Sequence, residues 1–173
     1  MKQGLLQVYT GNGKGKTTAA LGLALRALGH DWRVAVVQFL KGGAKHGESR
    51  ALKLFPPCHI WQYGRDVLID MHNPEPQDIA LARQGLAKAR QLIEGKNYDL
   101  LILDEICVAL ALNLIAEEEV RELLARRPAA LEIVLTGRYA PSWLIELADL
   151  VTEMCQIKHP FEQGIAAREG IEY

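Results

Sequence analysis

The sequence predicts an α/β protein with a doubly wound, mainly parallel sheet flanked by helices. Apolar runs typical of buried strands alternate with segments of helical periodicity. Several of these runs are continuously apolar, which indicates strands that are buried on both faces. The expected strands are Leu5–Tyr9, Arg33–Gln38, His59–Gln62, Leu100–Leu103, Leu131–Leu135 and Leu150–Met154, and the expected helices are Lys16–Leu28, Pro76–Ile93, Glu117–Ala125 and Pro141–Leu147.

Length and composition favour one domain over residues 1–173, with residues 158–173 as a C-terminal tail. Twenty basic and 21 acidic residues give a net charge of −1, which suggests neither a nucleic-acid nor a membrane partner. The chain starts directly at the first strand, without the pattern of a signal or transit peptide. Three cysteines without C-x-x-C spacing, Cys58, Cys107 and Cys155, are expected to be buried thiols in a reducing cytoplasm.

The first expected strand leads into the most specific motif of the chain, Gly-Asn-Gly-Lys-Gly-Lys-Thr-Thr, which opens the first helix. A strand, a glycine-rich turn, Gly-Lys-Thr and a helix are typical of the phosphate-binding loop (P-loop), here of the RecA-like class. Lys16 would contact phosphate, and Thr17 would offer its hydroxyl to Mg²⁺. The expected nucleotide-binding residues are Gly11, Asn12, Gly13, Lys14, Gly15, Lys16, Thr17 and Thr18.

This loop is one residue shorter than the usual pattern, because Thr10 stands where the first glycine would be and Gly11 follows it. The competing interpretation is a glycine-rich surface turn. Later segments also read as loops: Gly42–Ser49 is glycine-rich and polar and is expected to be mobile, and Gly64–Pro76 contains two prolines.

Two carboxylates, Asp104 and Glu105, follow the fourth expected strand. Carboxylates at that strand end can hold Mg²⁺ together with Thr17, although the sequence leaves open which of the two touches the ion. Arg138 follows the next strand and could pair with phosphate on the same rim, or form a surface ion pair.

Together these motifs resemble the P-loop-type ATP:corrinoid adenosyltransferases, which act on cob(I)alamin or cob(I)yrinic acid a,c-diamide. The resemblance spans nearly the whole length. It rests on the shortened loop, on Val-Gln-Phe-Leu-Lys-Gly at residues 37–42, on Leu-Asp-Glu at 103–105, on Leu-Thr-Gly-Arg at 135–138, and on the tail that begins Lys-His-Pro-Phe at 158.

The resemblance implies transfer of the 5′-deoxyadenosyl group of ATP to the cobalt of a reduced corrinoid, with release of triphosphate. It implies Mg²⁺ or Mn²⁺ as cofactor, with Lys16, Thr17 and Glu105 as catalytic residues, and it implies a flavoprotein reductant and a homodimer. In the family, the γ-phosphate lies where ordinary P-loop enzymes hold the α-phosphate, which leaves C5′ open to attack. Because the reduced corrinoid is itself the nucleophile, the chain needs no Ser/His/Asp or Cys/His arrangement, and none is evident.

The residues that would contact the corrinoid depart from the family pattern. An aromatic pair is expected in the loop before the long helix, where it would push the lower cobalt ligand away. This chain has Val67, Leu68 and Ile69 instead, which could form an apolar wedge. Lys41 and His159 are further candidates for corrinoid contact. The chain also lacks the N-terminal helical extension of some members, so a more open pocket is expected.

Two other functions fit the P-loop without the resemblance. A P-loop ATPase or kinase would cleave the γ-phosphate and yield ADP. A non-enzymatic nucleotide switch would only order its loops on binding.

Overall fold

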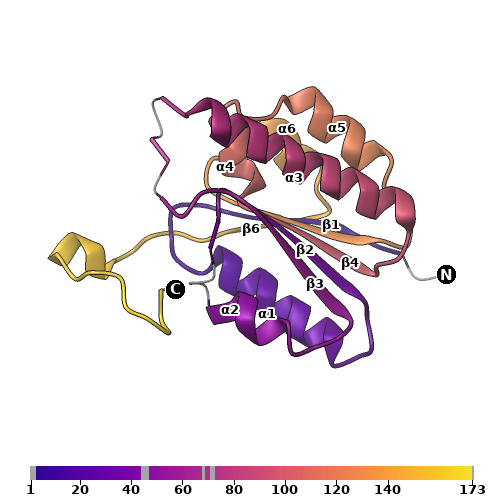
Figure 1. Cartoon of the computed structure of the whole chain (residues 1–173), viewed down its shortest axis with the longest axis horizontal. Coiled ribbons are helices and arrows are strands. Elements are labelled where there is room, and N and C mark those ends of the chain that lie inside the picture. Colours follow the sequence, from indigo (N-terminus) through magenta and orange to yellow (C-terminus); the bar gives the residue numbers. More distant parts are fainter. Residues whose placement is uncertain (1–2, 44–46, 68, 71–72, 173) are drawn as a thin grey trace.

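The computed structural model of the chain describes residues 3–43, 47–67, 69–70 and 73–172, and its centre is a six-stranded, entirely parallel sheet (Figure 1). The strand order is β3-β2-β4-β5-β1-β6. The elements are β1 (Leu6–Thr10), α1 (Lys16–Leu28), β2 (Val34–Phe39), α2 (Gly47–Leu52), β3 (Cys58–Tyr63), α3 (Pro76–Gly95), β4 (Leu100–Asp104), α4 (Ile106–Ala111), α5 (Glu117–Ala125), β5 (Glu132–Thr136), α6 (Ser142–Leu147), β6 (Leu150–Glu153) and the 3-10 helix η1 (Pro160–Gln163).

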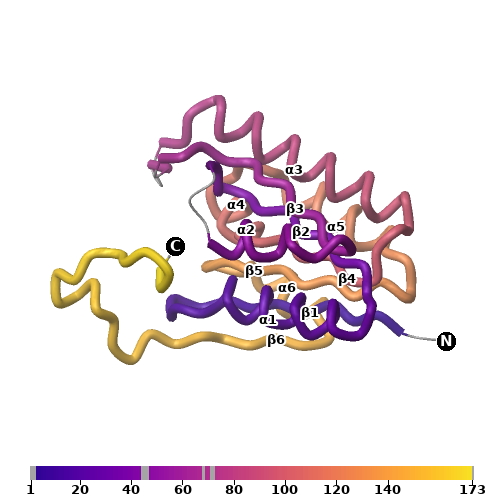
Figure 2. The backbone as a smooth tube through the Cα atoms, turned by 60° about the horizontal axis from the view of Figure 1, so that its bottom comes forward, coloured from indigo at the N-terminus to yellow at the C-terminus, as the bar shows by residue number. Residues whose placement is uncertain are grey.

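Helices cover both faces of the sheet, as the alternating pattern predicts. Figures 1 and 2 show α1 and α2 on one face and α3, α4, α5 and α6 on the other. Two hydrophobic clusters fill the space between the layers, one beneath α1 and a larger one beneath α3 to α6. The predicted doubly wound α/β fold is therefore confirmed.

The continuously apolar runs form the interior strands. Every residue of β2 and β4 is buried, whereas β6 at one edge is exposed along its length. The P-loop strand β1 and the carboxylate-bearing strand β4 both pair with β5, which lies between them. Because all strands are parallel, the P-loop and Asp104 emerge at the same edge of the sheet. Among the described residues, no helix is both long and apolar enough to cross a bilayer.

Two short helices differ from the sequence-based expectation. The predicted loop Gly42–Ser49 is wrong from Gly47 onward, because Gly47–Ser49 belongs to the six-residue helix α2. The helix α4 follows directly on Glu105 and was not predicted. Its sequence, Ile-Cys-Val-Ala-Leu-Ala, is apolar on all sides and shorter than two turns, so it has no amphipathic period that could be recognised. The thiols of Cys58 and Cys107 are buried as expected, but Cys155 is exposed.

A buried ion pair closes the base of the loop between β3 and α3. The guanidinium of Arg65 contacts both carboxylate oxygens of Asp78, at 2.7 and 2.9 Å, and one oxygen of Glu75 at 2.9 Å. Asp78 also accepts a hydrogen bond from the Glu75 backbone N–H, which caps the start of α3. This pair therefore ties the end of β3 to the first turn of the long helix.

Replacing Asp78 with asparagine should lower the free energy of unfolding by about 2 kcal/mol at pH 7, because the Arg65 guanidinium loses a buried charged acceptor. Hydrogen bonds from Arg65 hold the pKa of Asp78 below its ordinary value. A carboxyl whose pKa is lower in the folded state stabilises the fold above its unfolded pKa of about 3.9, and this contribution disappears as the pH falls through the folded value. Urea unfolding of both proteins over this range measures the difference.

The matched control is Glu94→Gln, which removes the carboxylate from an exposed pair with Arg126 at 3.8 Å. Its expected effect is below about 0.5 kcal/mol. Equal losses of stability in the two variants would contradict a special role for the Asp78 pair.

Candidate functional site

The P-loop is held in shape by its own lysine. Gly15 has φ = 122°, a conformation that favours glycine, and α1 starts at the next residue. The Lys16 ammonium donates hydrogen bonds to the carbonyl oxygens of Gly11 at 2.8 Å and Gly13 at 2.7 Å. Burial lowers the pKa of Lys16, while the nearby carboxylates of Glu105 and Asp104 act in the opposite direction. Lys16 thus lies folded over the loop from which it could reach a phosphate.

The end of β6 forms one wall of the loop. The Gly13 N–H donates to the Met154 carbonyl at 2.6 Å. A Cβ atom at Gly11 or Gly13 would lie only 2.5 or 2.7 Å from that carbonyl oxygen. The glycines are therefore required by close backbone packing as well as by the room a phosphate would need.

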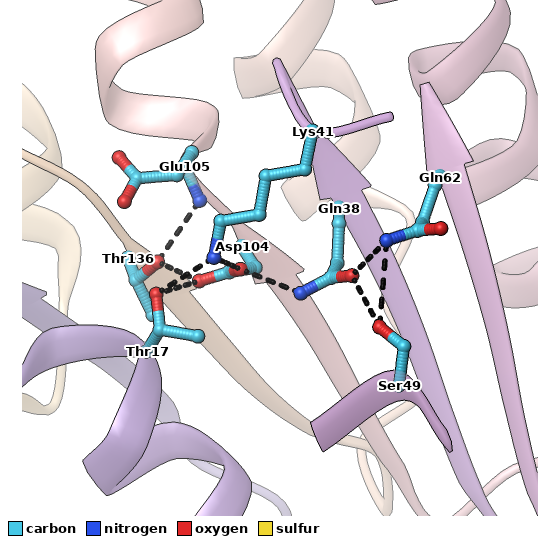
Figure 3. Close-up of polar contacts among 8 residues, drawn as sticks. All are labelled: Thr17, Gln38, Lys41, Ser49, Gln62, Asp104, Glu105 and Thr136. Atoms are coloured by element: carbon cyan, nitrogen blue, oxygen red, sulfur yellow. Dashed lines mark hydrogen bonds and ion pairs between the residues drawn. The ribbon is translucent and has the colours of Figure 1, made fainter. Parts of the chain in front are cut away.

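A row of polar side chains crosses the carboxyl edge of the sheet beside the loop (Figure 3). The parallel register pairs Gln38 of β2 with Asp104 of β4 and with Gln62 of β3. Gln62 donates to Gln38 at 3.0 Å, and Gln38 donates to Asp104 at 3.0 Å. Ser49 of α2 also donates to Gln38, at 3.2 Å. The row fixes the orientation of the buried Asp104 carboxylate.

Asp104 accepts hydrogen bonds at both carboxylate oxygens. Thr17 and Thr136 donate to Oδ1 at 2.8 and 2.7 Å, while Gln38 and Lys41 donate to Oδ2 at 3.0 and 2.8 Å. Burial alone would raise the pKa of Asp104, but the Lys41 ammonium and these hydrogen bonds outweigh it and lower the pKa. Likewise, burial alone would lower the pKa of Lys41, but the Asp104 carboxylate raises it. The pair is therefore ionised at neutral pH.

Glu105 faces a different way from its neighbour. It adopts a left-handed conformation with φ = 63°, and its N–H donates to the Thr136 hydroxyl at 2.9 Å. Its carboxylate points away from the polar row in Figure 3 and has no hydrogen-bond or ion-pair partner within the described part of the chain. Burial and the Asp104 charge raise the pKa of Glu105. The bend at the strand end thus presents an uncommitted carboxylate to the cavity.

That cavity has a volume of about 460 Å³ and opens over the P-loop. The start of α1, Lys41, Glu48 and Glu105 line it, and the tail residues Gly170–Glu172 close one side. Figures 1 and 2 show the yellow tail returning to the phosphate loop after it leaves the sheet. A larger cavity of about 600 Å³ lies near the other end of α1, lined by Arg26, His30 and Trp32 among others, and none of the nucleotide-binding motifs borders it.

The chain is similar to known proteins over nearly its whole length. It matches the family described as ATP:corrinoid adenosyltransferase BtuR/CobO/CobP over residues 2–173. A corrinoid adenosyltransferase of a Sinorhizobium species is 40% identical over 175 residues, which cover 99% of this chain and 81% of that protein. Corrinoid adenosyltransferases of Pseudomonas aeruginosa and Escherichia coli K12 are each 38% identical, over 99% of this chain and 85% and 87% of theirs.

The chain belongs to the ATP:corrinoid adenosyltransferase family. It is an enzyme of the class that transfers an adenosyl group from ATP to a corrinoid. The family and the activity that the sequence motifs implied are therefore confirmed. The family motifs quoted from the sequence, at residues 11–18, 37–42, 103–105 and 135–138, meet at one edge of the sheet, around the cavity and its polar row.

The family's candidate metal ligands fit a hard cation. The structure brings together the Thr17 hydroxyl and the Asp104 carboxylate, with the Glu105 carboxylate on the same cavity. These are oxygen donors of the kind that Mg²⁺ prefers. Among the described residues no cluster of three or more His, Cys, Asp or Glu side chains could hold a metal. The arrangement suits an ion bound by one or two carboxylates and by nucleotide phosphates.

The remaining predicted residues of the family site lie further out. Arg138 is exposed and makes no ion pair among the described residues. Its charge adds to the lowering of the Lys16 pKa by burial and partly offsets the rise in the Glu105 pKa. Val67 is exposed and Ile69 is half-buried in the loop after β3, whereas Leu68 lies outside the described residues. His159 accepts a hydrogen bond from the Phe161 N–H at 3.2 Å and so caps η1 locally. Lys41 thus lines the cavity over the P-loop, whereas His159 is not among the residues that line it.

Four polar residues of the site were not predicted: Gln38, Ser49, Gln62 and Thr136. Three of them stand at or next to the carboxyl ends of mostly apolar strands, which was a usable signal. Ser49 gave no such signal, because it reaches the row only through the unpredicted helix α2.

Replacing Glu172 with glutamine should tighten ATP binding about twofold to fivefold, because a negative charge leaves the mouth of a cavity that accepts a polyanion. Hydrogen bonds from Arg168 and Lys14 lower the pKa of Glu172 to about 2, so the carboxylate is ionised at neutral pH. It contacts the P-loop residue Lys14 at 2.8 Å. Isothermal titration with Mg·ATP measures the affinity.

Glu169→Gln is the control for this effect, since it removes the same charge from an exposed position in the same tail. Weaker ATP binding by Glu172→Gln than by the control would mean that the carboxylate assists the nucleotide instead of competing with it.

Proposed function

We propose that the enzyme transfers the 5′-deoxyadenosyl group of ATP to the Co(I) centre of a reduced corrinoid and releases intact triphosphate. The observation that carries this proposal is the family match over residues 2–173, whose motifs surround the cavity. In the reaction the electron pair of Co(I) forms the bond to C5′. The C5′–O bond breaks, and its electrons leave with the triphosphate.

The P-loop residues are proposed to bind and stabilise the leaving triphosphate. Residues Gly11 to Thr18 would surround the phosphates with backbone N–H groups, and Lys16 would turn from its two loop carbonyls to a phosphate oxygen. Arg138 would add positive charge at the rim. Donors aimed at developing negative charge in a water-poor site are the strongest electrostatic contribution that a protein makes to catalysis.

We propose Mg²⁺, or Mn²⁺ in its place, at Thr17, Asp104 and Glu105, where it would neutralise phosphate charge. Support comes from the hydroxyl and carboxylate donors that meet beside the cavity. Glu105 can contact the ion without losing a hydrogen bond, whereas Asp104 must first release one of the four donors that its oxygens accept.

No side chain is needed as nucleophile in this proposal. The buried thiols are poor candidates, because burial raises the pKa of Cys58 to about 11 and that of Cys107 to about 12, and both stay protonated at neutral pH. The corrinoid would lie against Val67, Leu68 and Ile69, with Lys41 and His159 as further contacts.

We also propose a homodimer, a flavoprotein as electron donor and a cytoplasmic location, all on the strength of the family resemblance. We propose a single domain over residues 1–173, with residues 158–173 as its tail, and the presence of all six described strands in one sheet supports this.

The deciding experiment is product analysis with ATP, Mg²⁺ and chemically reduced cobalamin in the absence of oxygen. Adenosylcobalamin and triphosphate should appear in equal amounts. Visible spectroscopy measures the adenosylcobalamin, and anion-exchange chromatography measures the triphosphate. ADP and phosphate without a cobalt–carbon bond would instead support a P-loop ATPase or kinase.

Light scattering of the same preparation should give twice the 19.2 kDa mass of one chain, and a stable monomer would contradict the dimer.

A further inference from the structure

The position proposed for the metal already holds a positive charge that belongs to the protein. The Lys41 ammonium donates to Asp104 Oδ2 at 2.8 Å and to the Thr17 hydroxyl oxygen at 3.2 Å (Figure 3). These are two of the groups proposed to hold Mg²⁺. The P-loop lysine does not take this place, because Lys16 is bonded to the loop carbonyls.

The surroundings of Lys41 favour this arrangement over a chance contact. The Asp104 side chain is fully buried, and the Lys41 side chain is 18% exposed. Burying an unpaired carboxylate is costly, so without a bound metal Asp104 requires a resident counter-ion. Leu40, directly before Lys41, adopts a left-handed conformation with φ = 62° that is rare for leucine and turns the chain at the end of β2.

We infer that Lys41 is a built-in substitute for the metal, which occupies the cation position in the nucleotide-free enzyme and is displaced when the metal–nucleotide complex binds. Two cations cannot share Asp104 Oδ2 and the Thr17 oxygen at these distances, so binding of one requires release of the other. The released ammonium has acceptors close by, because Glu48 and Glu105 line the same cavity and the phosphates would enter it.

This inference rests on the metal site of the proposed function and assigns Lys41 a positioning role. It has two consequences: the free enzyme binds divalent metal weakly, and metal enters together with the nucleotide. It also explains how Thr17 and Asp104 keep their geometry before substrate arrives, since Lys41 bonds to both.

The test is a titration of the nucleotide-free enzyme with Mn²⁺, in which electron paramagnetic resonance counts the free ion. In Lys41→Met the apparent dissociation constant should fall at least about tenfold below that of the wild type, because the ion no longer displaces an ammonium. Lys41→Arg keeps the charge and should bind as weakly as the wild type. Lys53→Met, an exposed lysine outside the site, is the control for loss of charge alone.

Thermal unfolding supplies a second readout. The melting temperature of Lys41→Met should rise with Mn²⁺ alone, whereas that of the wild type should not. If Lys41→Met folds only with Mn²⁺, that result also supports the inference. If it does not fold at all, Lys41→Gln, whose amide can still donate to Asp104, replaces it. Equal Mn²⁺ affinity in the wild type and the neutral variant would overturn the inference.

These measurements need neither ATP nor a corrinoid. Lys41→Met could therefore bind Mn²⁺ more tightly even if the product analysis shows no adenosyl transfer. That outcome would support the exchange of Lys41 for the metal in an enzyme that catalyses a different P-loop reaction. The converse outcome, adenosyl transfer without a change in Mn²⁺ affinity, would leave the proposed function intact and remove only the role of Lys41.

Discussion

Replacing Lys16 with methionine is expected to lower kcat about a hundredfold to a thousandfold, as loss of a charge-stabilising donor does in other active sites. It should also weaken ATP binding about tenfold or more, because a charge-assisted phosphate contact is lost. The methionine keeps the length and apolar stem of the lysine, so the buried position stays filled. Steady-state kinetics with reduced cobalamin and titration calorimetry with Mg·ATP separate the two effects.

The stability of Lys16→Met should change by only about 1–2 kcal/mol, since the variant loses two hydrogen bonds to the loop carbonyls. Lys53→Met should be unaffected in kinetics and serves as the matched control. Turnover near the wild-type rate in a folded Lys16→Met protein would remove the phosphate-binding role proposed for this loop.

The two neighbouring carboxylates should behave differently when their charges are removed one at a time. Asp104→Asn is expected to cost about 3 kcal/mol or more of folding stability, because Lys41 is left without its buried partner. It should also disturb the orientation of Thr17 and so lower turnover. Urea unfolding and steady-state kinetics measure the two effects.

Glu105→Gln should leave the stability within about 1 kcal/mol of the wild type, since this carboxylate lacks hydrogen-bond partners among the described residues. It should nevertheless lower kcat/KM at least about a hundredfold and shift the Mg²⁺ dependence to higher concentrations, as loss of a metal ligand does. Normal turnover by Glu105→Gln, together with loss of turnover by an Asp104→Asn protein that is still folded, would mean that Asp104 is the direct ligand of Mg²⁺.

The sequence was most informative where the signal is local. The P-loop and the strand that ends at Asp104 could be recognised because their chemistry depends on neighbouring residues. The contact between Lys41 and Asp104 could not, because it joins residues 63 positions apart through the pairing of β2 with β4. A residue pattern identifies a strand, but only the register of the sheet shows which side chains become neighbours.

The left-handed conformation of Glu105 was also beyond the sequence. An acidic residue before an apolar segment is compatible with a helix cap or a strand end, and neither predicts φ = 63°. The return of the tail to Lys14 depends on a few exposed contacts, which leave no periodic trace. In the structure the tail lies against the P-loop residue Lys14 of its own chain.

The wall that β6 and Met154 provide for the phosphate loop makes the shape of the nucleotide site depend on the edge of the sheet. The Gly13 N–H donates to the Met154 carbonyl just past β6, which itself pairs with β1. The loop therefore keeps this shape only while the exposed edge strand β6 stays in the sheet. Local opening of that edge would remove a support of the nucleotide site, which couples nucleotide binding to the stability of the sheet edge.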